Sequence, residues 1–185
     1  MTPTPEVVKL KVSFDIDQTS GKLDWDFTPR SRPVSGRHAG AILLQPGELL
    51  HLEVDGNGSA DSGLQAFKII ECCLMTRPQV IQIGRGLQPL FAAPSPFAGI
   101  DCASYAFPLD FDAGAPHTQP DGSLRIAQHW NGQLLVDKPP GRWDMSFLIT
   151  VLIDRGADEP LLRVFSFDPE SEVGDGTHQH DELPR

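Results

Sequence analysis

The sequence lacks several features that specialised classes of protein require. It carries 15 Lys and Arg against 25 Asp and Glu, a net charge of −10. Binding to nucleic-acid phosphates needs clustered cations, and an anionic membrane surface repels an acidic chain. No window of 18 apolar residues is present, which argues against a transmembrane helix. We therefore expect neither a nucleic-acid partner nor a membrane partner.

Cysteine is also scarce. The three cysteines, Cys72, Cys73 and Cys102, are an odd number without the spacing of a disulfide framework. Cys72 and Cys73 are adjacent, so they should point to opposite faces of a strand and not bridge each other. Residues 1–5 have neither the basic nor the apolar region of a secretory signal. These features predict reduced thiols buried in strands and a cytoplasmic protein.

A helical period is missing from the sequence, since no segment of 12 or more residues repeats apolar positions every 3.6 residues. Apolar and polar residues alternate instead, most clearly at 143–153, where every odd position is apolar. A short connection and a second apolar run, 161–167, follow it. The 17 Pro and 17 Gly divide the chain into short segments. The pattern predicts an all-β antiparallel sandwich, of jelly-roll or Ig-like type, with about ten strands.

The remaining strands are expected from the same alternation. Residues 8–16 and 23–27 should form one hairpin, and 124–130 with 134–136 a second, with Asn131-Gly132 at its tip. The apolar run 65–76 predicts a central strand buried on both faces. Shorter or interrupted strands are expected at 41–44, 50–54, 80–83 and 100–111, with a long ordered loop at 84–99. One domain should cover residues 6–169, after a flexible arm at 1–5 and before an acidic mobile tail at 170–185.

Two stretches carry residues of the types that bind metals. Residues 55–63 predict a polar loop in which Asp55, Asn57, Ser59 and Asp61 place oxygen ligands at alternate positions, as in a calcium loop. Ala60 stands where the sharp turn needs Gly, however, and Ala66 where a bidentate Glu is needed. A hydrated loop is therefore the preferred interpretation. His178 and His180 lie in the acidic tail, which is not expected to hold the rigid ligands of a zinc site.

Binding and catalytic candidates are equally sparse. Arg30, Arg32, Arg37 and His38 form a local basic cluster that could receive an anion or simply balance nearby carboxylates. Trp130, beside the expected Asn-Gly turn, is the best candidate for an exposed aromatic residue that stacks on a sugar.

Catalytic machinery is not indicated by the sequence. Carboxylate pairs such as Asp24 with Asp26 or Asp15 with Asp17 share a strand face, but any solvated strand face shows the same. No Cys or Ser stands in a motif with His. We therefore expect no catalytic residues and no cofactor.

Three stretches occur in a distinctive order. The first is Phe14-Asp15-Ile16-Asp17, and the second is Gly47-Glu48-Leu49-Leu50-His51-Leu52, followed by a polar loop and the apolar run 67–75. The third is 143–153, a short connection and Val164-Phe165-Ser166-Phe167-Asp168-Pro169. This order resembles the AidA/PixA inclusion-body protein family of bacteria over about residues 6–173. His51 departs from the family, which usually has an aromatic residue after the Gly-acidic pair.

The resemblance implies a cytoplasmic β-sandwich that self-associates or accumulates in the cell. The family has no established catalytic residues, so none is transferred to this chain. The sequence therefore favours a non-enzymatic, homo-oligomeric protein. The alternative is a binding module for a sugar or another small ligand, which would use loops at one end of the sandwich.

Overall fold

The computed structural model describes residues 6–28, 42–78, 80–83, 88–91, 93–138, 141–156, 159–167 and 170–173. Every regular element within these ranges is a β-strand, which confirms the predicted all-β class. In the same ranges there is no helix long and apolar enough to cross a membrane.

Two six-stranded sheets, here called sheet A and sheet B, make up most of the molecule, and a two-stranded ribbon accompanies them. Sheet A contains β2 (Asp24–Thr28), β1 (Val7–Asp15), β4 (Leu49–Gly58), β10 (Leu124–His129) and β9 (His117–Thr118) in this order, with β11 (Leu134–Leu135) also on β4. Sheet B contains β3 (Ile42–Leu44), β14 (Glu170–Val173), β12 (Gly141–Asp154), β5 (Ala66–Pro78) and β8 (Ser104–Ala106), with β13 (Leu161–Phe167) on β12. The ribbon pairs β6 (Val80–Ile83) with β7 (Gln88–Phe91).

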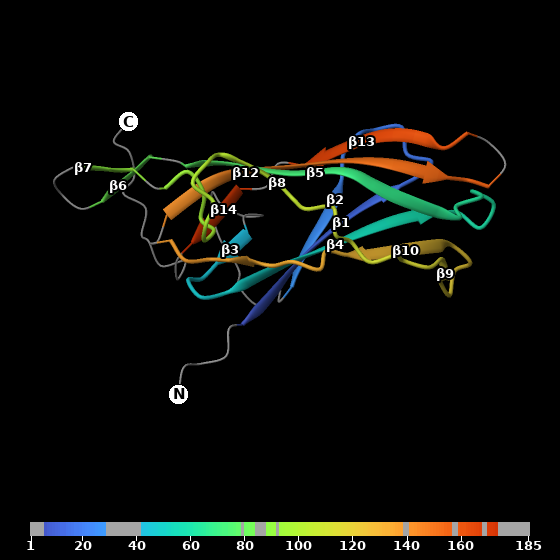
Figure 1. Cartoon of the computed structure of the whole chain (residues 1–185), viewed down its shortest axis with the longest axis horizontal. Coiled ribbons are helices and arrows are strands. Elements are labelled where there is room, and N and C mark those ends of the chain that lie inside the picture. The colour runs from blue at the N-terminus through green and yellow to red at the C-terminus, as the bar shows by residue number, and fades with distance from the viewer. Residues whose placement is uncertain are drawn as a thin grey trace.

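The inner faces of sheets A and B meet in one apolar core. Figure 1 shows β5, β12 and β13 in one layer and β4, β9 and β10 in the other. Phe14 of β1 lies 4.7 Å from Phe165 and 5.3 Å from Phe67, measured between ring centroids, and both partners belong to sheet B. Gly56 on β4 leaves room for this cluster, because a Cβ there would lie 2.9 Å from the Phe67 ring. Aromatic packing therefore joins the two layers.

Strand β12 is the longest strand and the centre of sheet B. Its six odd-numbered residues from Trp143 to Ile153 all point inward and are at most 1% exposed. It pairs with β5 along nearly its whole length, and with β14 and then β13 on its other edge. The predicted closing hairpin of 143–153 with 161–167 is therefore confirmed.

Strand β5 differs from its prediction because it contains a β-bulge. The β12–β5 register shifts so that Thr150 pairs with Glu71 and Val151 with Ile69, which leaves Ile70 as the extra residue. Before the bulge, odd positions such as Phe67 and Ile69 point inward, and after it even positions such as Cys72 and Leu74 do. Because the core-facing residues change from odd to even positions, the sequence reads as an unbroken apolar run, like that of a strand buried on both faces. In fact one face is buried, and Ile70 and Met75 are exposed.

Four other expectations need correction. Parallel pairs, β1 with β4 and β14 with β3, occur in both sheets, so neither sheet is purely antiparallel. The expected hairpin of 124–136 does not form, since β10 and β11 both pair with β4 along one edge. Residues 88–91, expected in a loop, form β7, and only 104–106 of the expected strand 100–111 forms β8. Sheet B continues through β14 to Val173, beyond the expected end of the domain at 169.

We expect folding to require that the core-facing residues of β12 remain apolar. Ile149→Asp would place a charge at a position that is 0% exposed. The cost of burying that charge would exceed the roughly 5–15 kcal/mol by which most domains are stable. Leu162→Asp, on the neighbouring strand β13 at 56% exposure, is the matched control. Circular dichroism with thermal melting should show a cooperative transition for Leu162→Asp only, and a folded Ile149→Asp protein would contradict this.

Candidate functional site

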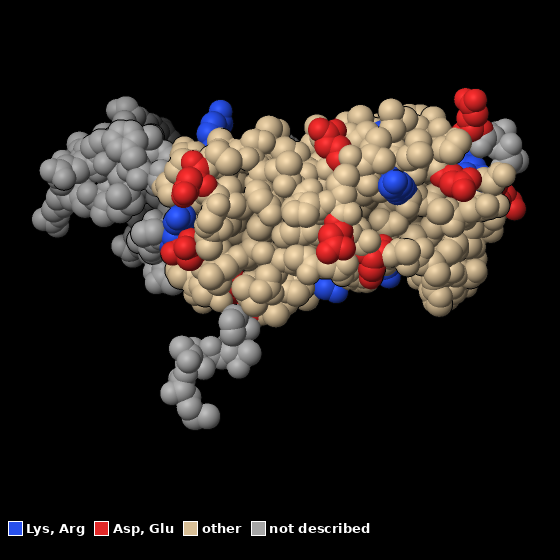
Figure 2. Space-filling view, viewed as in Figure 1, with Lys and Arg blue, Asp and Glu red and all other residues tan. Residues whose placement is uncertain are grey.

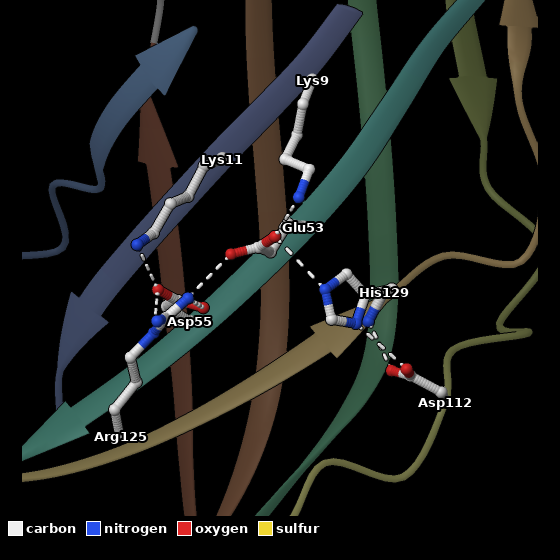
Figure 3. A network of polar contacts seen from close by, with 7 residues as sticks. All are labelled: Lys9, Lys11, Glu53, Asp55, Asp112, Arg125 and His129. Carbon is white, nitrogen blue, oxygen red and sulfur yellow. Dashed lines mark hydrogen bonds and ion pairs between the residues drawn. The ribbon is translucent and has the colours of Figure 1, made fainter. Parts of the chain in front are cut away.

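A network of ion pairs and hydrogen bonds lies on the outer face of sheet A. Along β4, Leu50, Leu52 and Val54 point into the core, so alternation turns Glu53 and Asp55 outward. Both carboxylates are nonetheless buried, with side chains 7% and 1% exposed. They are covered by long cationic side chains from the two flanking strands, β1 and β10 (Figure 3).

Three cations neutralise these two carboxylates. Lys9 Nζ lies 2.9 Å from Glu53 Oε2, and Lys11 Nζ lies 2.6 Å from Asp55 Oδ2. Arg125 joins the two carboxylates, since its Nε donates to Asp55 Oδ2 at 2.6 Å and its Nη2 donates to Glu53 Oε1 at 2.8 Å. The side chains of the cations are one third to one half exposed, so they remain in contact with water. The network therefore links three strands of sheet A through their side chains.

His129 extends this network to a third carboxylate. Its Nε2 lies 3.2 Å from Glu53 Oε2 and its Nδ1 lies 3.0 Å from Asp112 Oδ2 (Figure 3). The backbone N–H of His129 also donates to Asp112 Oδ1. Asp112 thus fixes the end of β10, and the imidazole lies between the carboxylates of Glu53 and Asp112.

The electrostatics of the site follow from this pairing. Burial alone would raise the pKa of Glu53, but the hydrogen bond from Lys9 and the charges of Lys9, His129 and Arg125 outweigh it, so the pKa lies below the usual value. Burial likewise raises the pKa of Asp112, but the hydrogen bonds and the charge of His129 lower it by more. The pKa of Asp112 therefore also lies below its usual value. The pKa of Arg125 is raised, chiefly by its hydrogen bond to Asp55.

These properties limit the chemistry of the site. A carboxylate that acts as an acid, base or nucleophile must reach a substrate, and a general acid needs a raised pKa. Glu53 has a lowered pKa, and the oxygens of Glu53 and Asp55 already accept from Lys, Arg or His. The arrangement can hold strands together and respond to acid. It does not present a carboxylate to a substrate.

Sequence reasoning missed this network. Asp55 was expected in a loop, but β4 continues to Gly58, and Asn57 donates to the Phe14 carbonyl across the β1 pair. Alternation alone would have placed Glu53 and Asp55 on the outer face. Their partners Lys11 and Arg125 lie 44 and 70 residues away from Asp55, and only the strand order β1-β4-β10 brings them together.

The calcium hypothesis is not supported by the positions of its ligands. Asp55 and Asn57 belong to a strand, and Asp55 is paired with two cations, whereas Asp61 lies in the turn that follows. Among the described residues no group of three His, Cys, Asp or Glu is arranged to hold a metal. The prediction of a polar loop is correct only from Ser59 onward.

Trp130 is buried, so the prediction of an exposed aromatic side chain is wrong. It is 6% exposed, lies 4.8 Å from Phe107 between ring centroids, and donates from Nε1 to the Pro108 carbonyl at 3.1 Å. Asn131-Gly132 is not a hairpin tip but part of a break between β10 and β11 on the same edge of β4. The indole packs across Gly132, where a Cβ would lie 2.3 Å from the ring.

The other candidates divide into two groups. Arg30, Arg32, Arg37 and His38, and the tail histidines His178 and His180, lie outside the described residues. The carboxylate pairs are described. Asp17 lies 3.0 Å from Arg155, whereas Asp15 and Asp24 are exposed at the ends of their strands. On the face of the molecule in Figure 2, described charges of both signs are scattered and do not form a patch.

The cysteines also depart in part from expectation. Cys72 is buried in β5, and burial raises the pKa of its thiol far above the usual value, so it is inert. Cys73 is partly buried, and its sulfur lies 3.3 Å from the Ser104 hydroxyl. Cys102 was expected to be buried in a strand, but it is exposed in the segment before β8. All three thiols are free, as predicted.

The outer face of sheet B contrasts with that of sheet A. Its outward residues on β5, β12 and β13 include six large apolar side chains, which we call the apolar face: Ile70, Met75, Leu148, Leu152, Leu162 and Val164. The strand register places Leu152 beside Leu162, and Thr150 between Glu71 and Val164. Four of the six are at least 40% exposed. Exposed apolar side chains on adjacent strands of one sheet face can mark a site of association.

Comparison with known proteins gives little further guidance. No family model matches the chain, and no curated protein matches it. Among solved structures, the chain is similar to an inclusion body protein (PixA) from Burkholderia cenocepacia J2315, with a TM-score of 0.41 and 10% identity, over 94% of this chain and 99% of that chain. These values indicate at most a distant structural relationship. Membership of the AidA/PixA family stays a prediction from the sequence motifs.

The first prediction from the site concerns acid stability. Because the pKa of Glu53 is lower in the folded than in the unfolded state, its contribution is present above the unfolded pKa, near 4.3, and is lost as pH falls through the folded value. Glu53→Gln should lower stability at pH 7 by about 2 kcal/mol and lose less stability than wild type as pH falls below about 5. Urea unfolding across pH measures both effects.

Asp24→Asn is the control for this experiment, because Asp24 is an exposed carboxylate on the same sheet. It should reproduce the wild-type profile within about 0.5 kcal/mol. An equally steep acid dependence in Glu53→Gln would show that Glu53 does not carry the effect.

The second prediction concerns Trp130. Gly132→Ala forces the indole away from its position, because the added Cβ would overlap it. We expect a loss of about 2 kcal/mol and a change in the near-ultraviolet circular dichroism of Trp130. Gln133→Ala, the exposed neighbour, should change neither. An unaltered spectrum in Gly132→Ala would argue against this packing.

Proposed function

We propose that this protein is a non-catalytic β-sandwich whose role is self-association. The observation that carries the proposal is the apolar face on the outside of sheet B, where four apolar side chains are at least 40% exposed. An exposed surface of this kind is unfavourable in water and gains free energy when a partner covers it. Cytoplasmic location and accumulation as inclusion bodies are further parts of this proposal, and they come from the sequence resemblance.

The chemistry of the outer face of sheet A supports a non-catalytic role. Its two buried carboxylates are held by Lys9, Lys11 and Arg125, and the pKa of Glu53 is lowered rather than raised. These features favour a structural network over an acid–base pair. The sugar-binding alternative depended on an exposed Trp130, and burial of that indole removes its basis.

The proposal predicts that the purified chain forms oligomers. Size-exclusion chromatography with light scattering should give a mass above 20.2 kDa that rises with protein concentration. Leu162→Asp places a charge in the apolar face and should weaken association at least tenfold, since truncating or charging a central contact typically costs more than about 1 kcal/mol. Leu109→Asp is the matched control, because Leu109 is 53% exposed but lies outside the apolar face.

A wild-type protein that stays monomeric at every concentration would refute the proposal. Equal weakening by Leu109→Asp would show that added negative charge, and not the apolar face, is responsible.

A further inference from the structure

We propose that the apolar face binds the same face of a second copy of this chain, with the two β5 strands antiparallel, so that Lys68 of each copy meets Glu71 of the other. This inference rests on the proposed self-association and names the surface, the partner and the orientation.

The first argument is the contrast between the two outer faces. Sheet A turns a satisfied ionic network outward, with the cations of Lys9, Lys11 and Arg125 in contact with water. Sheet B turns the apolar face outward across three adjacent strands. The β-bulge at Ile70 contributes directly, because it brings both Ile70 and Glu71 to the outer side of β5. Sheet A also exposes Val7 and Leu135 on either side of Leu49, at one end of β4. Sheet B carries the larger set of exposed apolar side chains and therefore gains more by being covered.

The second argument concerns what could cover the apolar face. The two longest segments outside the described residues, 29–41 and 174–185, carry only one large apolar side chain each, Val34 and Leu183. That content is too small to bury six large apolar side chains. An anionic membrane is disfavoured by the net charge of −10. A second copy brings an apolar surface of matching size.

The third argument is charge complementarity. Most of an acidic chain repels another copy of itself, so association requires a region of balanced charge. The outward side of β5 carries Lys68 and Glu71, one of each sign, three residues apart and on either side of Ile70. Thr150 Oγ1 donates to Glu71 Oε2 at 2.7 Å, which holds this carboxylate on the outer face.

The orientation follows from symmetry. A two-fold contact uses the same surface on both copies, so any residue i that meets residue j also has j meeting i. With the two-fold axis crossing β5 midway between Lys68 and Glu71, each lysine faces the glutamate of the partner. The two sheets then stack face to face at the usual separation of about 10 Å. Parallel β5 strands in the same register would instead place like charges together.

Charge reversal tests the orientation. Lys68→Glu places two glutamates opposite each other at both contacts, and Glu71→Lys places two lysines there. Each variant alone should associate about tenfold more weakly than wild type, since two pairs change from attraction to repulsion. Mixed in equal amounts, the two variants face each other with opposite charges. The mixture should form a heterodimer with affinity within about threefold of wild type, as measured by sedimentation velocity.

Two controls separate association from folding and from net charge. Thermal melting of each variant checks the fold, because Glu71→Lys loses the hydrogen bond from Thr150. Asp24→Lys reverses an exposed charge on sheet A and should leave association within about twofold of wild type.

The outcomes distinguish the two proposals. A wild-type monomer would overturn both. A wild-type oligomer that neither single variant weakens would leave self-association standing and overturn this surface. A chain that stays monomeric and binds only a different protein would overturn both proposals. Single variants that are weakened but do not associate on mixing would overturn the antiparallel orientation. We expect weakened association for each variant by itself and recovery of association only when the two variants are mixed.

Discussion

The strict two-residue alternation of side chains along β12 is the constraint on which the rest of the structure depends. Six consecutive inward positions of this strand are closed to water, and β5, β13 and β14 all take their register from it. A slip of one residue in the register would point the side chains of Phe147 and Ile149 toward solvent. The bulge at Ile70 shows how strong this constraint is. The sequence of β5 changes phase there, and the sheet accepts an unpaired residue so that both halves of β5 can face the core.

Desolvated charge is the second organising feature, and it depends on strand order. Asp55 is 1% exposed, and a carboxylate at this depth is tolerated only with partners that compensate for its lost hydration. Lys11 and Arg125 supply that compensation from strands on either side of β4. Because the parallel β1–β4 pair and the antiparallel β4–β10 pair set these distances, the network is specific for this arrangement of strands. It favours the native strand order over alternatives that would leave the carboxylate without cations.

Sequence reasoning succeeded where the signal is local and failed where distant segments meet. Alternation at 143–153 is visible in one window, so β12 and its hairpin with β13 were predicted correctly. Gly56 and Gly58 suggested a loop, yet Gly56 belongs to a strand because the rings of Phe14 and Phe67 occupy the space that a Cβ would need. Asn131-Gly132 indicated a hairpin tip, but Gly132 is required by the Trp130 indole that packs across it. Gly56 makes room for rings that are distant in the sequence. Gly132 makes room for a ring only two residues away, but that ring is placed by its packing on Phe107 and its hydrogen bond to the Pro108 carbonyl, which no local window shows.

The outer faces of sheets A and B differ in the residues that they expose. A chain that needed only to stay soluble would carry polar residues on both outer faces, as alternation readily allows. In the middle of β4 the outward positions are indeed Glu53 and Asp55, although burying them requires three cations from neighbouring strands. On β12 and β13 the outward positions include Leu148, Leu152, Leu162 and Val164, which contribute little to the core from that side. Apolar residues that do not serve the core are best explained by contact with another molecule. Since the chain is acidic while this surface carries both signs, another copy of the chain is the partner that its charge favours.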